Sequence, residues 1–365
     1  MKTKITLALG CFILHSSFFL SAFAQGSLTP PGAPVPMMKS LDQVEARTPI
    51  SSAPFTITNS GSYYLTTNLT VSSGDAIDIN TNGVTLDLNG FTLCSTAASA
   101  TGYGIWLNNN SSFTVKDITI VNGHIRSGVT NNGSGVYSGS GFAFGINYSG
   151  NSPANVVISK VSVAGVLSHG IYLGSGNATV VEACTVTTAG ANGITASTIK
   201  ASVATDCGVS AISGDQVADC RGQSVNSYGV YASSTALNCY GNSGNGTGLY
   251  AGTAQNCYGQ GGSNPGISCY IAQNCSGQSL TGTGLSAQYL AQNSFGQGNT
   301  GIGLAASTAV NCFGYGFGSS PGLAATRANS CYGFSSSGTG LVATNANFCF
   351  GSSVIVTTTN KYNMP

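Results

Sequence analysis

Charged residues are scarce in this chain of 365 residues. Lysine and arginine number 11, aspartate and glutamate 10, and together they are 6% of the sequence, whereas ordinary globular proteins have roughly 25%. Because the formal net charge is only +1, the chain has no basic surface with which to attract nucleic acid. None of the ten carboxylates lies beyond Asp219. The C-terminal part therefore cannot supply a catalytic carboxylate or a Ca²⁺ site built from side chains.

Proline and histidine are also rare, with 10 and 3 residues, whereas glycine is abundant, with 51 residues. The glycines follow no Gly-X-Y period, which excludes collagen. Hydrophobic residues make up 42% of the chain, more than a disordered chain contains. A neutral chain rich in glycine, serine, threonine and asparagine needs a fold in which nearly every backbone group is hydrogen bonded.

The amino terminus is typical of a secretory signal, which we assign to residues 1–24. Lys2 and Lys4 precede an apolar stretch over 5–20, and Ala22-Phe23-Ala24 forms a cleavage motif before Gln25. Polar residues interrupt the stretch, and no other segment is long enough to span a membrane. We expect the mature protein to be secreted, or to lie at the cell surface or in the periplasm.

The rest of the chain divides into three predicted segments. Residues 25–52 are proline-rich and predict an extended linker or leader. Residues 53–357 form the main domain, and 358–365 a C-terminal tail. Within the domain, the glycine- and serine-rich stretch 127–142 interrupts the repeat spacing described below. We interpret it as a disordered insertion, with a loop that projects from one corner and shapes a groove as the alternative.

An internal repeat dominates the sequence from residue 217 onward. A block of the type Ala-x-Asn-Cys-Tyr-Gly recurs every 18 or 19 residues, and its glycine is present in all eight copies, from Gly222 to Gly351. The cysteine position of the block is occupied by Cys220, Cys239, Cys257, Cys275, Ser294, Cys312, Cys331 and Cys349.

A second motif, glycine followed by an aliphatic residue, precedes each block. It runs from Gly229 to Gly340 and can be traced back, at wider spacings, to Ala76-Ile77-Asp78-Ile79. The segments are short and β-branched, and no window has a 3.6-residue apolar period. A period of 18–19 residues fits three short strands joined by tight turns. We therefore predict an all-β chain, a right-handed parallel β-helix (a solenoid) of about 13 rungs.

In-register stacking places identical residues about 4.8 Å apart along the axis. The asparagines before the cysteines should then form a ladder of amide hydrogen bonds at one corner. The glycine of the block has two interpretations. It either supplies a positive φ at that corner, or it marks a strand that passes too close for a Cβ atom.

Two segments resemble secreted bacterial right-handed parallel β-helix repeat proteins of the broad pectate-lyase-like superfold. One is the entry segment 59–93, and the other is the G-L-x-A-x-x-A-x-N-C-Y-G repeat over 229–351. With the turns between them, the resemblance covers about 53–357. It implies the fold but no single activity, because that superfold hosts lyases, hydrolases, adhesins and inert spikes.

Eleven cysteines remain once Cys11 leaves with the signal, an odd number that precludes complete intramolecular pairing. Parallel stacking keeps neighbouring Cβ atoms near 4.8 Å, beyond the ~3.8 Å that disulfides prefer. Ser294 also shows that the position does not require a thiol. We predict a stripe of buried free thiols, with disulfides between turns as the alternative. No Cys-x-x-Cys pair or nearby histidine indicates a metal, and we predict no cofactor.

An aromatic position follows the cysteine position and should face the opposite side of the strand. If the thiols point inward, these rings point outward, where they could stack on sugars. Lateral packing under a turn, or an inward stack of rings with the cysteines outside, are the alternatives. The candidate binding residues are Tyr240, Tyr258, Phe295, Phe313, Tyr332 and Phe350.

Catalytic candidates are confined to the N-terminal turns. The resemblance implies that pectinolytic enzymes use either carboxylates holding Ca²⁺ with a basic residue, or clustered aspartates with a histidine and an Arg-x-Lys pair. Asp75 and Asp78, three apart on a strand, are expected on opposite faces, and Asp87 is expected to bond turn amides. The other candidates here are Asp117, His124, Arg126, Lys160 and His169.

We therefore favour a non-catalytic secreted or surface-associated rod that binds polysaccharide or a cell-envelope glycan. The alternative is a carbohydrate-active enzyme, a polysaccharide lyase or glycoside hydrolase of the pectinolytic type, that uses the N-terminal turns. The two hypotheses differ in whether carboxylates cluster in an open groove. The sequence does not indicate an oligomeric state.

Overall fold

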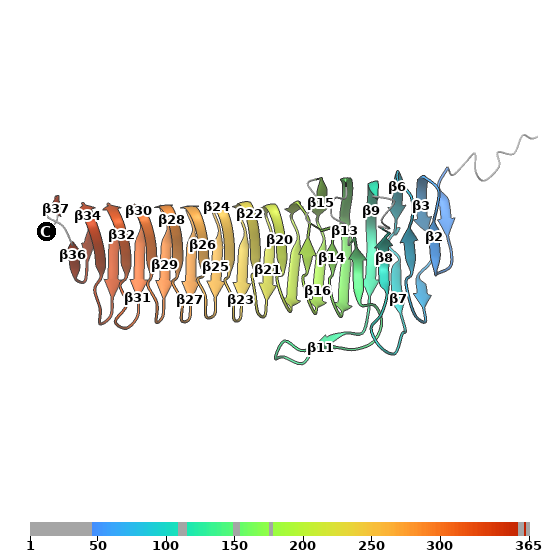
Figure 1. Cartoon of the computed structure of the whole chain (residues 1–365), viewed down its shortest axis with the longest axis horizontal. Helices are drawn as coiled ribbons and strands as arrows, with labels where there is room; N and C mark the ends of the chain where they lie inside the picture. Colours follow the sequence, from blue (N-terminus) through green and yellow to red (C-terminus); the bar gives the residue numbers. More distant parts are fainter. Residues whose placement is uncertain (1–45, 109–114, 149–153, 175–177, 357–360, 363–365) are drawn as a thin grey trace, which may run out of the picture. The chain divides into compact units, whose positions relative to one another are not determined.

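The chain folds as a parallel β-solenoid, the fold that the repeat predicts (Figure 1). The computed structural model describes residues 46–108, 115–148, 154–174, 178–356 and 361–362. These residues contain strands and no helix, and hence no helix long and apolar enough to cross a membrane. The predicted signal, residues 25–45 of the predicted linker and most of the predicted tail lie outside the described residues.

Parallel pairing defines a column of 15 register partners, one per turn, that begins at Phe55 and ends at Val354. The predicted count of about 13 turns is therefore slightly too low. The first and last turns were missed because Phe55 and Val354 do not follow the glycine-aliphatic motif.

The N-terminal turns are irregular, and their strands lie before Arg221, where the regular turns begin. They are β1 Thr48–Ile50, β2 Phe55–Ile57, β3 Gly61–Leu65, β4 Leu69–Val71, β5 Ile77–Ile79, β6 Val84–Asp87, β7 Thr92–Ser95, β8 Tyr103–Leu107, β9 Lys116–Arg126, β12 Phe144–Asn147, β13 Ala154–Val166, β14 Ile171–Tyr172, β15 Thr179–Glu182, β16 Thr185–Ala189, β17 Ile194–Thr195, β18 Thr198–Lys200, β19 Val203–Cys207 and β20 Ile212–Ala218.

The regular turns alternate a short strand with a long one. They are β21 Arg221–Ser224, β22 Val230–Leu237, β23 Tyr240–Ser243, β24 Leu249–Gln255, β25 Tyr258–Gly261, β26 Ile267–Gln273, β27 Ser276–Ser279, β28 Leu285–Gln292, β29 Phe295–Gly298, β30 Leu304–Val310, β31 Phe313–Gly316, β32 Leu323–Asn329, β33 Tyr332–Ser335, β34 Leu341–Asn347, β35 Phe350–Gly351, β36 Val354–Val356 and β37 Lys361–Tyr362.

Each long strand covers two of the three sides of a turn. β20 shows this directly, because it pairs with both β17 and β18, which are separate strands of the preceding turn. The register shifts between Ala232 and Thr235 where β22 pairs β24, which marks the bend within the long strand. The solenoid also includes β1, which pairs with β3 and buries Ile50.

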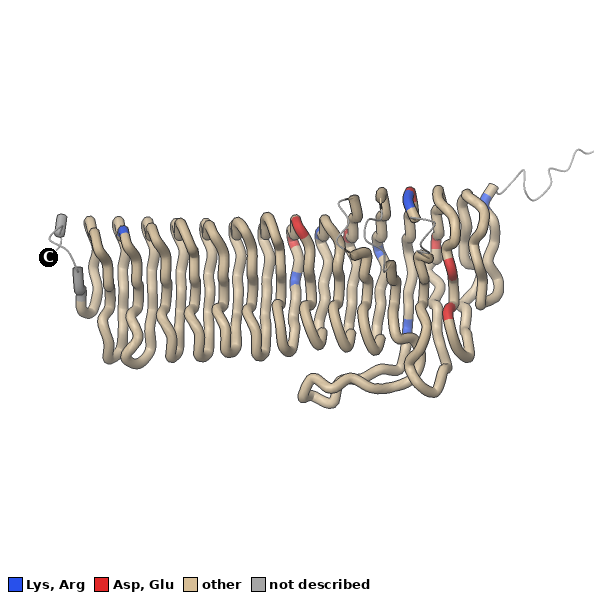
Figure 2. The backbone as a smooth tube through the Cα atoms, in the orientation of Figure 1, with Lys and Arg blue, Asp and Glu red and all other residues tan. Residues whose placement is uncertain are grey.

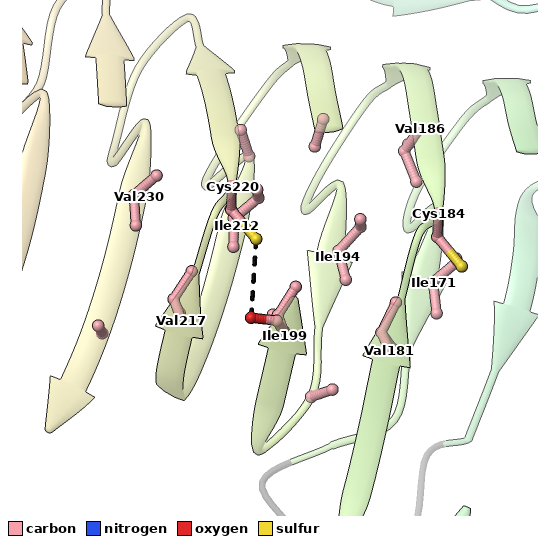
Figure 3. Close-up of a cluster of buried hydrophobic side chains, with 14 of the residues drawn as sticks. Ile171, Val181, Cys184, Val186, Ile194, Ile199, Ile212, Val217, Cys220 and Val230 are labelled. Atoms are coloured by element: carbon pink, nitrogen blue, oxygen red, sulfur yellow. Dashed lines mark hydrogen bonds between the residues drawn. The ribbon is translucent and has the colours of Figure 1, made fainter. Parts of the chain in front are cut away.

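A narrow apolar core fills the interior of the solenoid. One residue of each glycine-aliphatic motif points inward and is fully buried, as at Ile212 and Leu249. Cysteines of the repeat also point inward, and Figure 3 shows Cys220 among such aliphatic side chains. The Cys220 thiol donates a hydrogen bond to the Ile199 carbonyl oxygen at 3.6 Å. All eleven described cysteines are free, and all but Cys94 are buried.

Asparagines form the predicted ladder at one corner. The side-chain amide of Asn256 donates to Asn238 at 3.2 Å and that of Asn274 to Asn256 at 3.2 Å, and the series continues to Asn311. These asparagines, not the glycines, have the left-handed backbone, with φ of 53° at Asn274. The positive-φ interpretation of the glycine position is therefore wrong. Asparagine tolerates this conformation because its short polar side chain bonds locally.

The glycines instead permit close approach of backbone segments, both across one turn and between neighbouring turns. A Cβ atom at Gly296 would overlap the carbonyl oxygen of Gly303, and one at Gly303 would overlap the backbone of Tyr315. Both glycine positions of the repeat are thus required because the interior is too thin there for any side chain.

The stretch 127–142 is ordered, so its interpretation as a disordered insertion is wrong. It contains an antiparallel hairpin of β10 (Thr130–Asn131) and β11 (Tyr137–Ser138), which projects from the stacked turns (Figure 1). Asn131 and Tyr137 both donate to a carboxylate oxygen of Asp206, at 2.6 and 3.1 Å. The hairpin is ordered because this aspartate, more than sixty residues away in sequence, anchors it.

Candidate functional site

The residues that flank the glycine-aliphatic motif in four N-terminal turns form one outer surface. Because the aliphatic residue points inward, the residue after it faces outward by strand alternation. The residue before the glycine does not follow that alternation, and its ring lies against the outward one, as at Tyr103–Trp106 and His169–Tyr172. We call this surface the acidic–aromatic face. Its residues are Asp75, Asp78, Tyr103, Trp106, Phe144, Asn147, His169 and Tyr172.

Five rings stack along this face. Tyr103 lies with its ring centroid 5.5 Å from that of Trp106 and 4.7 Å from that of Phe144. Phe144 lies 5.9 Å from His169, which in turn lies 4.5 Å from Tyr172. The stack thus crosses three consecutive turns of the solenoid, and its rings are partly exposed. Such a surface is apolar at its ring faces and polar at its edges.

Two carboxylates lie at the N-terminal end of the stack. Asp75 accepts the backbone N–H of Tyr103 at 2.9 Å. Burial raises the pKa of Asp78 to about 6, and the charge of nearby Asp75 contributes to the rise. The expectation that the two lie on opposite faces is therefore wrong. β5 begins only at Ile77, so Asp75 belongs to the preceding corner and does not follow the alternation of the strand.

Two buried polar atoms of the face have no hydrogen-bond partner among the described residues. They are Oδ1 of Asp78 and Nε1 of Trp106, and the two residues are register partners on adjacent turns. Since buried polar groups are nearly always satisfied, an unpaired acceptor beside an unpaired donor indicates a place for a polar ligand or water.

Burial lowers the pKa of the His169 imidazole, which favours its neutral form. Its Nδ1 accepts the backbone N–H of Asn192 at 3.3 Å, which assigns the ring proton to Nε2. The face therefore offers an N–H donor here without a positive charge.

The remaining catalytic candidates lie on other strands. Asp117 accepts from the side chain of Asn155 at 3.0 Å, and Arg126 donates to the Ser162 hydroxyl at 3.5 Å. His124 and Lys160 belong to β9 and β13, which pair with each other rather than with β5 or β8. Of the seven candidates, the structure thus places Asp75, Asp78 and His169 on one face, with His169 three turns away from the two aspartates. Asp87 bonds the Asn89 N–H at 2.8 Å, the turn role expected for it.

The aromatic position of the repeat faces outward on a different side of the turns. Tyr240 and Tyr258 stack with centroids 5.2 Å apart, and Arg221 lies over the Tyr240 ring at 4.7 Å. Beyond Ser276 the rings resume, with Phe295 and Phe313 5.3 Å apart and Tyr332 5.2 Å from Phe313. Tyr332 and Phe350 are the most exposed. A groove beside the asparagine ladder is lined by Arg221, Tyr240 and Tyr258.

No group of three or more potential metal ligands occurs among the described residues. Burial raises the pKa of the Cys220 thiol to about 11, so this thiol stays protonated at neutral pH. A protonated, enclosed thiol is a poor nucleophile and a poor metal ligand.

Sequence reasoning missed five residues of the acidic–aromatic face. They are Tyr103, Trp106, Phe144, Asn147 and Tyr172, and each flanks a glycine-aliphatic motif that was recognised for its buried residues. Writing the repeat with its flanks gives Asp-Ala-Ile-Asp, Tyr-Gly-Ile-Trp, Phe-Gly-Ile-Asn and His-Gly-Ile-Tyr. That alignment would have found the face, because flanking positions of stacked motifs must superpose.

The sequence matches no protein-family model, and no curated protein is significantly similar to it. Two solved structures with a similar fold come from Azotobacter vinelandii. The A-module of mannuronan C-5 epimerase AlgE4 is 12% identical, with 84% of this chain and 89% of that chain covered and a TM-score of 0.34. The A-module of AlgE6 is 11% identical, with 84% of this chain and 88% of that chain covered and a TM-score of 0.30.

A third structure, Geobacillus virus E2 ORF18, is 12% identical and covers 84% of this chain and 55% of that chain, with a TM-score of 0.22. Scores this low support no inference about the activity of the present chain. The class that the fold defines is therefore the parallel β-solenoid, and function must be argued from the face itself.

Proposed function

We propose that this protein binds a saccharide on the acidic–aromatic face. The observation that carries the proposal is the stack of five rings on consecutive turns, ending at two carboxylates. Aromatic faces pack against the C–H surfaces of sugar rings, while a few placed polar groups fix the orientation of hydroxyls. Asp78 and His169 supply an acceptor and a donor of that kind.

A glycan array probed with the mature chain tests this proposal, followed by calorimetric titration of the best ligand. Trp106→Ala removes a ring from the face and should weaken binding at least tenfold. Phe348→Ala removes a half-exposed ring at the corner between β34 and β35 and serves as the matched control. Absence of any glycan ligand, or equal affinity of the Trp106 variant and the parent, contradicts saccharide binding at this face.

A second candidate function is cleavage of the bound saccharide. The specific observation in its favour is Asp78, which has a pKa of about 6, an unpaired buried oxygen and a second carboxyl nearby. A carboxyl with a raised pKa can protonate a glycosidic oxygen near neutral pH. Release of reducing ends by the parent, lost in Asp78→Asn while binding persists, would establish this activity. Binding without release supports the non-catalytic proposal.

We also propose that the protein works outside the cytoplasm. The predicted signal over 1–24 motivates this proposal, and the burial of ten of the eleven described cysteines is compatible with it. Enclosed, protonated thiols react slowly with oxidants and disulfides, so the core can persist in an oxidising compartment. Fractionation of cells that express the full chain, beside a variant with Ala22 and Ala24 replaced by bulky residues, tests export. The outward column from Tyr240 to Phe350 stays a predicted second saccharide surface.

A further inference from the structure

A second aromatic cluster, made only of tyrosines, lies further along the solenoid. The Tyr231 and Tyr250 rings stack 5.2 Å apart with an interplanar angle of 7°, and Tyr228 packs against both. Tyr270 and Tyr289 extend the cluster, with ring centroids 5.8 Å apart and exposed fractions of 46% and 57%. We call these five residues the tyrosine cluster.

The tyrosine cluster continues the acidic–aromatic face. Register pairing links Trp106 to Asn147 and Tyr172, then to Thr195 and Ser213, and then to Tyr231 and Tyr250. Trp106, Tyr172, Tyr231 and Tyr250 therefore lie in one outward column, in which two turns with small polar side chains separate the two clusters. At about 4.8 Å per turn, the seven steps from Asp78 to Tyr250 span roughly 34 Å.

The same face stays open beyond the tyrosines. A groove there has a floor of small side chains, among them Ser286, Ala305 and Ala324, which follow Ser268 in the column. A linear ligand lying parallel to the axis thus meets rings, then a polar stretch, then rings, and then a shallow groove.

The charge of this face discriminates between classes of polysaccharide. The positions that flank the glycine-aliphatic motif contain no lysine or arginine from Asp75 to Val342, and their two carboxylates, Asp75 and Asp78, both lie at one end. Figure 2 shows how few charged residues occur along the regular turns. Polyuronates and sulfated glycans would lack a cationic partner here and would be repelled by ionised Asp75 and Asp78.

We propose that the tyrosine cluster is a second subsite, and that one long, neutral polysaccharide chain occupies both clusters in parallel with the solenoid axis. This inference rests on the proposed saccharide binding at the acidic–aromatic face. Engagement of the second cluster by a chain already held at the first is intramolecular, so affinity rises with chain length once the ligand spans both.

The test compares a trisaccharide and a dodecasaccharide from the same neutral polymer (xylan, mannan or β-glucan, whichever the array selects). The parent should bind the longer ligand at least tenfold more tightly. The double variant Tyr231→Ala with Tyr250→Ala should lose this gain and keep the trisaccharide affinity. Phe348→Ala, outside both clusters, should preserve both affinities. Polygalacturonate of matched length should bind at least tenfold more weakly.

Each failure has its own meaning. If the parent does not bind the trisaccharide or the dodecasaccharide, the proposed function itself fails. If the parent binds both equally, or if the double variant retains the gain for the longer ligand, the second subsite is overturned while saccharide binding stands. If polygalacturonate binds as tightly as the neutral ligand, the inference that the ligand is neutral is wrong. Circular dichroism and a melting curve confirm that the double variant is folded.

Discussion

Asparagine and glycine have complementary roles in each regular turn. The asparagine adopts the left-handed conformation at the corner, with φ between 49° and 54° from Asn238 to Asn311. From Asn256 to Asn311, its side-chain amide donates a hydrogen bond to the side-chain oxygen of the asparagine in the preceding turn. The glycine three residues later has no positive φ but lies against the opposite wall of the turn. Each residue type is thus selected by a different constraint, one on backbone torsion and one on space.

Replacing Gly296 by alanine should destabilise the solenoid. The added Cβ atom would overlap the Gly303 carbonyl oxygen and lie 2.9 Å from the Leu304 Cβ atom, so the two walls must separate. We expect a loss of about 1–3 kcal/mol in the free energy of unfolding, measured by denaturant titration. Gly244→Ala is the control, because its new Cβ atom would lie 3.1 Å from the Val225 oxygen at an exposed position. Equal stability of the Gly296 variant and the parent would contradict the close-approach explanation.

Asp78 should make stability depend on pH. Its native pKa of about 6 lies above the ordinary value of 3.8, so between these values the native state binds more protons than the unfolded state. Stability is therefore greatest near pH 4, falls as pH rises through about 6, and is constant above that. The loss should be about 1 kcal/mol, after discounting for the solvent screening of a half-exposed group.

Melting curves from pH 4 to 8 measure this dependence. The parent should melt a few degrees lower at pH 7 than at pH 4.5. Asp78→Asn should remove most of the slope, because the amide does not titrate. A parent curve that rises over this range would show that the pKa of Asp78 is not raised.

At the scale of elements, long strands and one hairpin depart from the regular repeat. β13 runs for 13 residues and pairs with β15 and β16 of the next turn. β20 is one strand that covers two sides of its turn, whereas β17 and β18 cover those sides as separate strands in the preceding turn. The β10–β11 hairpin adds no turn. Backbone bonds from Val129 to Gly165 and from Ala100 to Gly139 hold its base, and side chains hold its strands. Asp206 joins Asn131 and Tyr137 of the hairpin to Thr188 of the adjacent turn.

Asp206→Ala should release the hairpin without unfolding the solenoid. The hairpin loses its two bonds to the carboxylate, while backbone pairing of the turns is unchanged. We expect chymotrypsin to cut after Tyr137 at least several times faster than in the parent, with a melting temperature changed by a few degrees at most. Asp219→Ala is the matched control, since Asp219 also has a positive φ, of 55°, and accepts one bond from Asn238. Equal cleavage of both variants would show that Asp206 is not the anchor.

At the scale of the molecule, each turn contacts its immediate neighbours, so stability is approximately a sum of turn and interface terms. The N-terminal turns have large aliphatic residues in the core, such as Ile105 and Ile120, whereas the regular turns rely on leucine with alanine and cysteine. Small interior residues suit the thin cross-section that the paired glycines impose. The thiols therefore act as packing groups in the core.

Thiol labelling tests this view of the core. At pH 7 the native mature chain should react with a maleimide at Cys94 at most, because the other described thiols are buried and thiols such as Cys184 and Cys331 have a pKa raised to about 11. In denaturant all eleven should react within the same period, as counted by mass spectrometry. Rapid native labelling of several cysteines, or fewer than eleven free thiols in denaturant, would contradict a closed core of free thiols.

The sequence alone determined the architecture and the residue positions that repeat along the solenoid axis. A period of 18–19 residues forces identical positions to superpose, so the buried cysteines, the asparagine ladder and the outward rings from Tyr240 to Phe350 could each be derived by counting. The turn count fell short by two only where Phe55 and Val354 break the motif. Local periodicity suffices here because every contact repeats at the same sequence separation.

Only the tertiary structure decided the candidate site and the irregular features. Asp75 and Asp78 share a face because a corner separates them, and alternation along a strand cannot reveal where that strand begins. Tyr103, Phe144 and His169 stack although 41 and 25 residues separate them, since inserted loops change the spacing but not the register. The Asp206 anchor of the hairpin likewise joins positions that have no periodic relation. Contacts such as those of Asp206 depend on how the chain is placed in space, and no repeat in the sequence encodes them.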